Sequence, residues 1–135
     1  MTVTLNATAK SKRMQLVADL IDGKVPAAAT GSATAGKLVI GTSALSGATG
    51  VLVEIPLATP CFTESGGVLT LGGLPLSAVA SATGTAAKAE LRTNGGTTVV
   101  SGLTVGTTGT DIVLGTTAIV TGLSVIVTAG TLTHA

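Results

Sequence analysis

The chain has one histidine, His134, and one cysteine, Cys61, and these are the residue types most suited to chemistry. A histidine beside a cysteine or serine can activate a nucleophile when packing holds the two side chains within about 3 Å. His134 is the penultimate residue, and chain ends fray unless packing ties them down. One histidine and one cysteine also do not complete a tetrahedral metal site without carboxylates from elsewhere. The residue types therefore predict neither a nucleophilic dyad nor a metal site.

The acidic residues are the second set suited to chemistry, because paired carboxylates act as general acids and bases. No two of them are spaced for joint work within one element, so only the fold can bring them together: Asp19, Asp22, Glu54, Glu64, Glu90 and Asp111. Asp111 follows Thr-Gly-Thr and is interpreted as a turn or strand-entry residue. Glu90, with Lys88 and Arg92, is interpreted as the solvated face of one strand. We predict no catalytic residue and no enzymatic activity.

A glycine-rich stretch, GSATAGK over residues 31–37, matches part of a phosphate-binding loop. Leu38 stands where that loop needs a serine or threonine to reach Mg²⁺. The loop must also follow a strand and open a helix, so that the helix N-terminus faces the phosphate. Here a low-complexity stretch precedes the glycines and a β-rich run follows them. We therefore predict no nucleotide site, and no cofactor is implied.

The composition argues against several classes of partner. Charged residues make up 10 % of the 135 residues and the net charge is +1, which disfavours nucleic-acid binding. Phe62 is the only aromatic residue, so bases have no stacking platform elsewhere in the sequence. No apolar run reaches the ~18 residues of a membrane span, and no signal peptide is recognisable. A lone cysteine cannot form an internal disulfide, which fits synthesis in a reducing cell. We predict no nucleic acid, no membrane and no small-molecule substrate.

Residues 86–133 give the clearest structural signal, because apolar and polar residues alternate between glycine-containing turns. Leu123, Val125 and Val127 alternate with Ser124 and Thr128, which predicts an inward-facing apolar row. Asn94-Gly95 predicts a type I′ hairpin turn. The stretch is therefore predicted to be a β-meander. The whole chain, residues 1–135, is predicted to be a single all-β domain, an antiparallel β-sandwich or jelly-roll-like fold with one short N-terminal helix.

The helix is predicted over residues 7–22, with Gly23 as its stop. A helical wheel places five apolar residues on one arc, which predicts that they are buried: Met14, Leu16, Val17, Leu20 and Ile21. The opposite, polar arc holds Lys12, Gln15, Asp19 and Asp22. Two roles remain open for this helix. It either closes one end of the β domain or docks onto a partner through its basic start.

The rest of the chain reads as short strands between loops. Pro56 predicts that its strand lies at a sheet edge or ends there. Strands are predicted over residues 2–5, 37–40, 51–57 and 68–71. The remaining stretches are predicted as a low-complexity loop at 24–36, a loop at 41–50, a bend at 59–62 and a connection starting at 74–76.

Several of these stretches together resemble a family of small tailed-phage proteins. The resemblance is carried by ATGTA at 82–86, a strand ending in Leu91-Arg92, Gly95-Gly96, GLTVG at 102–106, DIVL at 111–114 and the closing strand at 123–133. The opening residues 5–23 also resemble the family's short N-terminal helix ending in Asp-Gly. The chain departs from the family at Lys88-Ala89, where Trp-Phe is common. The matching residues are those of turns and strands and contain no chemical motif.

The resemblance implies a structural protein of the virion that is made in the cytoplasm of the host bacterium. Small β proteins of this size often decorate capsids, and a low-charge sheet surface rich in threonine and glycine can lie flat on another protein. We therefore expect a capsid decoration (cement) protein on the capsid surface, which binds and stabilises the assembled shell. Its partners would be the major capsid protein and copies of itself, as a homotrimer at a three-fold axis. A tail or tail-tip module that binds a receptor is the alternative, because the resemblance does not separate head from tail.

Overall fold

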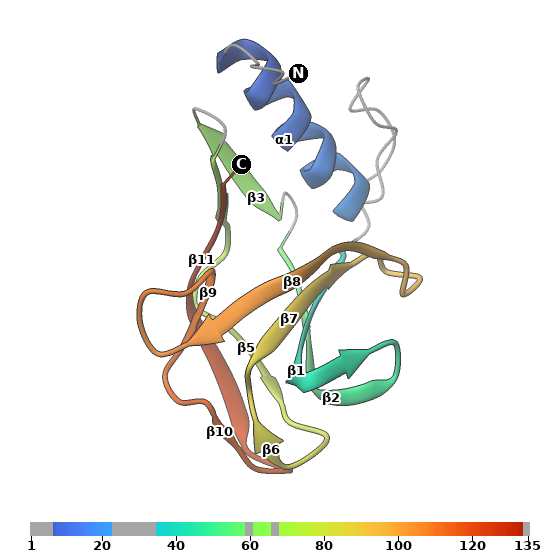
Figure 1. Cartoon of the computed structure of the whole chain (residues 1–135), viewed down its shortest axis with the longest axis vertical. Helices are drawn as coiled ribbons and strands as arrows, with labels where there is room; N and C mark the ends of the chain where they lie inside the picture. Colours follow the sequence, from blue (N-terminus) through green and yellow to red (C-terminus); the bar gives the residue numbers. More distant parts are fainter. Residues whose placement is uncertain (1–6, 23–34, 59–60, 66–67, 134–135) are drawn as a thin grey trace, which may run out of the picture.

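The computed structural model describes residues 7–22, 35–58, 61–65 and 68–133, with side chains from Lys12 onward. Within them, one helix, α1 (Ala7–Ile21), stands at one end of a body made of strands (Figure 1). The expected all-β fold with one short N-terminal helix is confirmed. Among the described residues no helix has both the length and the apolar character needed to cross a bilayer.

The strands form one long sheet and one small one. In chain order they are β1 (Lys37–Ser46), β2 (Thr49–Pro56), β3 (Phe62–Ser65), β4 (Val68–Leu71), β5 (Leu76–Val79), β6 (Gly84–Thr85), β7 (Lys88–Arg92), β8 (Thr98–Gly106), β9 (Ile112–Leu114), β10 (Ala118–Ile119) and β11 (Ser124–Thr133). The long sheet has the order β2-β1-β7-β8-β9-β11-β4-β3, with β5 also paired to β11. β10 pairs with β6 in the small sheet.

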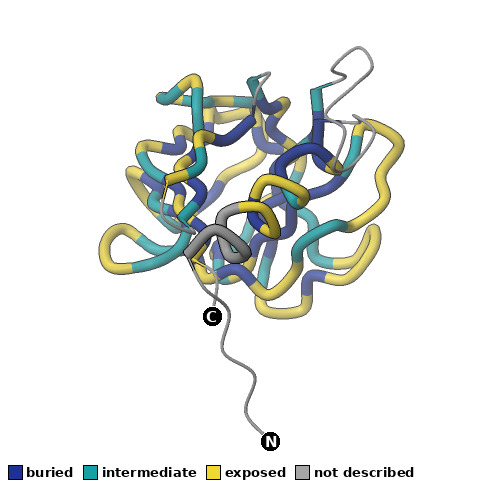
Figure 2. Tube along the Cα trace, turned by 90° about the horizontal axis from the view of Figure 1, so that it is seen from above, coloured by how far each residue is buried: buried dark blue, intermediate teal, exposed yellow. Residues whose placement is uncertain are grey.

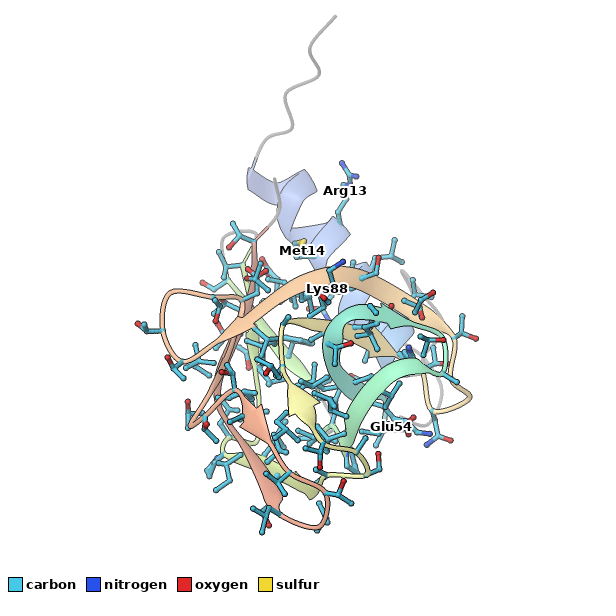
Figure 3. The ribbon with its side chains drawn as sticks, turned by 60° about the horizontal axis from the view of Figure 1, so that its bottom comes forward. Arg13, Met14, Glu54 and Lys88 are labelled. Carbon is cyan, nitrogen blue, oxygen red and sulfur yellow. The ribbon has the colours of Figure 1, made fainter. Side chains whose placement is uncertain are left out.

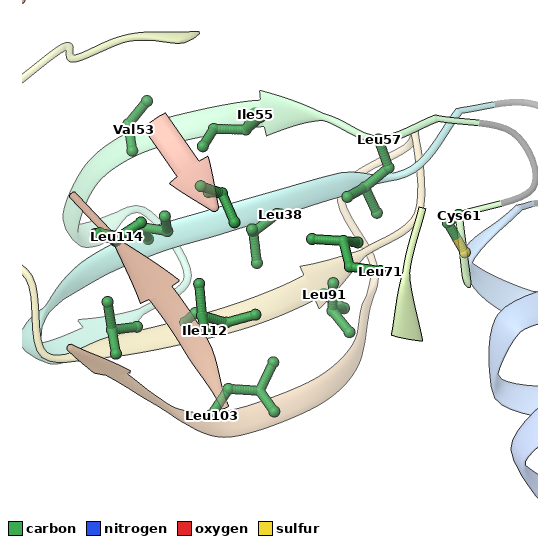
Figure 4. Close-up of a cluster of buried hydrophobic side chains, with 14 of the residues drawn as sticks. Leu38, Val53, Ile55, Leu57, Cys61, Leu71, Leu91, Leu103, Ile112 and Leu114 are labelled. Atoms are coloured by element: carbon green, nitrogen blue, oxygen red, sulfur yellow. The ribbon is translucent and has the colours of Figure 1, made fainter. Parts of the chain in front are cut away.

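The core lies between the two halves of the long sheet, which folds over on itself. Leu38 of β1 and Leu91 of β7 face Ile112 of β9 and Leu71 of β4 across this core (Figure 4). Each of these four side chains is at most 3 % exposed. In β1, β7, β4 and β9 the aliphatic residues of this interior occupy alternate positions, as the alternating pattern predicts.

The predicted meander over residues 86–133 is correct only in part. β7 and β8 form an antiparallel hairpin, and β9 pairs antiparallel with β11. β8 and β9, however, run parallel over Val105↔Ile112 and Gly106↔Val113, and β10 leaves the run to pair with β6. The Asp111 carboxylate accepts hydrogen bonds from the Thr104 backbone N–H at 3.0 Å and hydroxyl at 3.1 Å. These bonds hold the connecting loop against β8, so that the chain enters β9 in the same direction.

The hairpin turn between β7 and β8 differs from the predicted type I′ turn at Asn94-Gly95. The N–H of Gly96 donates to the Thr93 carbonyl at 3.0 Å, and the positive φ of 94° falls on Gly96. Gly95 does not have a positive φ. A turn followed by a left-handed glycine is the usual longer alternative to a two-residue hairpin. The hairpin and the position of its turn at Asn94-Gly95 are confirmed, but the predicted type I′ is wrong, because Gly95 lacks the positive φ that this type requires.

The predicted loop at 41–50 is instead the end of β1, a tight turn and the start of β2. Ser46 pairs with Thr49 across this turn, where Gly47 has a φ of 56°. Gly41 allows the hairpin to close, because a Cβ there would lie 2.4 Å from the Gly50 carbonyl oxygen. Alternation is weak in this glycine-, serine- and threonine-rich stretch, so the sequence did not mark it as strand. The strand at 68–71 is confirmed as β4, and Pro56 does end β2, an edge strand.

Helix α1 is confirmed, but it is rotated relative to the predicted wheel. Leu16 and Leu20 are 37 % and 38 % exposed, whereas Asp19 and Asp22 are 3 % and 1 % exposed. The buried face consists of Met14, Ala18, Asp19, Ile21 and Asp22. Along the part of α1 whose burial is described, exposed residues predominate toward the start and buried residues toward the end, over the strands (Figure 2).

The physical reason for the rotation is that α1 lies close to the strands on the side of the helix that carries the small Ala18 side chain. α1 packs against β3 and β4. There the Asp22 carboxylate accepts the backbone N–H of Cys61 at 3.1 Å, so a polar group is stabilised inside. The predicted strand at 2–5, most of the loop at 24–36, part of the bend at 59–62, and His134 lie outside the described residues.

Candidate functional site

Cys61 lies at the buried contact between α1 and the sheet. The Cys61 thiol donates a hydrogen bond to the Ala18 carbonyl oxygen at a distance of 3.7 Å, and the whole of Cys61 is buried. Burial, followed by the hydrogen bond and negative charge of Asp22, raises the pKa of the Cys61 thiol far above its ordinary value. The thiol therefore stays protonated at neutral pH, and the thiolate is the nucleophilic form. The contact holds α1 in place and does not favour nucleophilic chemistry.

We expect Cys61 to react slowly with a thiol reagent in the native protein. The rate should be at least about 100-fold lower than in urea, because both burial and the raised pKa suppress the thiolate. The measurement is the labelling rate with an aromatic disulfide, followed by absorbance, with and without denaturant. Equal rates in the two conditions would show that the contact between α1 and β3 is not formed.

Glu90 and Arg92 form a buried ion pair on β7, which corrects their interpretation as a solvated face. Their residues are only 8 % and 7 % exposed. Arg92 Nη2 and Nε donate to Glu90 Oε2 at 2.7 and 2.9 Å. The Thr98 hydroxyl of β8 donates to the same oxygen at 3.2 Å. Lys88 alone of the three predicted residues is exposed, as expected for a solvated face (Figure 3).

The tip of the β1–β2 hairpin is the element that buries this pair. Arg92 Nη2 also donates to the carbonyl of Gly47, at the tip, over 2.8 Å. Val39 pairs with Glu90 across the ladder, so the two side chains share a face. Val39 is fully buried and Leu45 is 9 % exposed, yet both lie outside the main core cluster. The hairpin tip thus makes a second, small buried layer on the outer face of β7.

The pair has little capacity for acid–base chemistry. The Glu90 carboxylate already accepts hydrogen bonds from a guanidinium and a hydroxyl, so the oxygen that makes these bonds is not free to approach a substrate. A hollow of about 420 Å³ beside it is lined by Arg92, Glu54, Val51 and Thr98 among others. Arg92 brings no net positive charge to this hollow, because Glu90 neutralises it. The geometry favours a structural role over ligand binding.

The remaining acidic residues are not gathered by the fold. Asp111 does precede β9, which confirms its interpretation as a strand-entry residue. Glu54 lies 3.7 Å from Lys37 in a partly exposed pair. Within the described residues, no group of three or more histidine, cysteine, aspartate and glutamate side chains is placed to hold a metal ion.

A cluster of exposed aliphatic side chains forms the most distinctive surface of the described chain. We call it the end patch, and it consists of Val79, Val120, Leu123 and Ile126. These residues are 61 %, 47 %, 61 % and 47 % exposed, respectively. They lie at the end of β5, just after β10 and around the start of β11, at the end of the molecule opposite α1 (Figure 1).

Local geometry explains why these side chains point outward. Val79 pairs with Ser124, and Ile126 pairs with Ser77, so Val79 and Ile126 lie on the same outer face of the β5–β11 ladder. Val120 and Leu123 precede the ladder. Val125 and Val127 face inward, as predicted, at 6 % and 0 % exposure.

Leu123 was expected to join this inward row, and that prediction is wrong. It ends a turn in which its N–H donates to the Val120 carbonyl at 3.1 Å, before the ladder with β5 begins. The strand alternation therefore does not extend to it.

The end patch contains no charge, and three of its residues, Val120, Leu123 and Ile126, line a hollow of about 140 Å³. The hollow is lined by residues of 115–126, which are glycine, alanine, serine, threonine and aliphatic residues. The labelled charged residues Arg13, Lys88 and Glu54 lie around α1 and the β1–β2 hairpin instead (Figure 3). A cluster of exposed apolar side chains on a protein surface is typical of an interaction site such as a protein–protein contact.

Comparison with known proteins adds no assignment to this geometry. No family model, no curated protein and no solved structure matches the chain. The interpretation of the end patch and of the buried pair of Glu90 and Arg92 therefore depends only on their contacts, burial and charge.

Proposed function

We propose that this chain is a non-enzymatic structural protein of a tailed-phage virion. More specifically, it is a capsid decoration protein that binds the assembled major-capsid shell and stabilises it, which is the simplest role for a surface without chemistry. The observation that carries the proposal is the end patch, an exposed and uncharged aliphatic surface. The resemblance to small tailed-phage proteins supplies the virion context.

The burial of the lone aromatic residue supports this role over receptor binding. Phe62 is the only aromatic residue of the sequence and is 4 % exposed. It therefore offers no stacking platform to a sugar ring or a base. A receptor-binding tail module would need to recognise a glycan without any aromatic contact.

Decoration works through binding energy that is spread over a surface. A protein–protein contact of standard size buries ~1,600 Å². A protein that binds only the assembled shell stabilises that shell by mass action. The proposal includes a homotrimer at a three-fold axis of the shell, in which copies of the chain contact one another and the major capsid protein.

The test is the number of copies in purified virions, measured by quantitative mass spectrometry. A decoration protein should approach the copy number of the major capsid protein. Particles that lack it should assemble but release their genome at a lower temperature, and the purified chain should restore resistance when it is added back. A copy number far below that of the capsid protein, or recovery only with detached tails, would replace decoration with the tail alternative.

A further inference from the structure

We infer that the tip of the β1–β2 hairpin is a strap that opens and closes over the outer face of β7. The strap consists of residues 43–49. In its closed position it covers the ion pair of Glu90 and Arg92 together with Val39, and all three residues are buried. The inference goes beyond the proposed function and does not depend on it.

The first argument is that little of the strap is tied to the rest of the sheet. β1 pairs with β7 only from Lys37 to Gly41, and β2 lies at the edge of the sheet. The ladder between β1 and β2 is itself interrupted after Gly41 and resumes only in the pair Ser46↔Thr49. Of residues 43–49, only Leu45 is buried. A segment with few buried side chains and an interrupted ladder opens at a lower free energy than the body of a domain.

The second argument is the nature of the contacts that hold the strap closed. Arg92 Nη2 donates to the Gly47 carbonyl at 2.8 Å. The Leu45 side chain folds back over β1, because a Cβ on Gly41 would lie 2.7 Å from Leu45 Cδ1. Gly41 and Val39 are two positions apart on β1, so Leu45 lies on the face that carries Val39. A charge-assisted hydrogen bond and one leucine side chain therefore fasten the strap.

The third argument is that the ion pair does not need the strap. Glu90 and Arg92 both belong to β7, so the bonds of 2.7 and 2.9 Å between them remain when the strap moves. Among the described residues, every hydrogen bond to the Glu90 carboxylate ends on Oε2. Water that enters on opening can hydrate Oε1 and the guanidinium, which offsets part of the lost contacts. The open state is therefore accessible without unfolding of β7.

The fourth argument is the shape of the surface beside the strap. Gly47 and Arg92 line the hollow of about 420 Å³, whereas Leu45 and Glu90 line a second hollow of about 270 Å³. The strap and the ion pair thus contribute walls to both hollows. When the strap opens, the two hollows join into one groove across the outer face of β7, with Val39 at its floor. The strap controls access to this groove.

The experiment compares two valines of the same hairpin that are both 0 % exposed. Val39 lies under the strap, and Val53 lies in the main core cluster. Each is replaced by cysteine in the full chain and labelled with an aromatic disulfide. Mass spectrometry of peptides separates labelling at position 39 or 53 from labelling of Cys61. Val39→Cys should be labelled at least about 30-fold faster than Val53→Cys, because opening of the strap requires less free energy than global unfolding.

The dependence on urea identifies the motion. The labelling rate of Val39→Cys should rise little at low urea concentrations, because strap opening exposes little surface, whereas that of Val53→Cys should rise steeply. Arg92→Lys keeps a cation beside Glu90 but lacks the fork that also reaches the Gly47 carbonyl. It should raise the labelling rate of Val39→Cys at least about 10-fold, the usual effect of losing a hydrogen bond to a charged group.

Far-UV circular dichroism establishes that each variant is folded. Leu45→Cys, on the strap itself, takes the place of Val39→Cys if that variant does not fold. Equal labelling rates and equal urea dependences at the strap and at position 53 would overturn the inference, because the strap would then open only when the whole domain unfolds. Fast labelling that Arg92→Lys leaves unchanged would also overturn it, because the bond to Gly47 would then not hold the strap closed.

Discussion

Replacing Arg92 by alanine is expected to lower the free energy of unfolding by about 3–5 kcal/mol, the usual effect of removing one partner from a buried ion pair. The variant leaves the Glu90 carboxylate, 8 % exposed, without its guanidinium. It also removes the 2.8 Å bond to the Gly47 carbonyl, which holds the tip of the β1–β2 hairpin against β7. Equilibrium unfolding in urea measures the loss.

Lys37→Ala is the matched control, because it removes the cation of an ion pair at the surface. The side chains of Lys37 and Glu54 are 35 % and 48 % exposed and their charged atoms are 3.7 Å apart. Water and salt screen such a pair, so the control should change stability by about 1 kcal/mol or less. Glu90→Gln keeps the shape of the side chain and should destabilise the protein through the unpaired Arg92. Equal effects of Arg92→Ala and Lys37→Ala would mean that the hairpin tip does not cover the pair.

Ile21→Ala is expected to lower the free energy of unfolding by about 2–5 kcal/mol, as for other large aliphatic side chains removed from a core. Ile21 is fully buried and is part of the main core cluster, at the end of α1. Its surroundings are tight, because a Cβ on Gly36 would lie 2.7 Å from Ile21 Cγ2. The cavity left by alanine is therefore filled only if the chain moves. Thermal and urea unfolding both report this loss.

Leu20→Ala, one residue earlier, should destabilise the protein by about 1 kcal/mol or less, because Leu20 is 38 % exposed. The helical wheel instead predicts similar losses for the two variants, because it places both Leu20 and Ile21 on the buried arc. A loss for Leu20→Ala as large as that for Ile21→Ala would show that α1 sits on the sheet in the rotation expected from the sequence.

Local pattern was sufficient for much of the secondary structure. The helix at 7–22 and the strands at 51–57 and 68–71 were predicted within a few residues of α1, β2 and β4. These elements depend on period, on caps and on breakers such as Pro56, which act within a few residues of the chain. The inward row of Val125 and Val127 was predicted for the same reason.

The position and composition of the end patch are much harder to predict from the sequence. The end patch joins Val79 to residues 120–126 through the pairing of β5 with β11, about 45 positions apart in the chain. Its only local signal was the glycine at 122, which marks the turn before Leu123 but not the direction of the leucine side chain. Strand alternation by itself predicts that the Leu123 side chain faces inward, because it treats Leu123 as the first residue of the strand.

The sequence by itself determined that this chain forms strands around a small aliphatic interior with a helix near its start, because alternation and turn residues act locally. Only the tertiary structure decided which polar residues are buried and which leucines are exposed. Glu90 and Arg92 become buried because the tip of a distant hairpin covers them, and Asp22 because it meets the backbone of Cys61. Burial depends on contacts between segments far apart in the chain, and a helical wheel or a strand alternation describes one segment at a time.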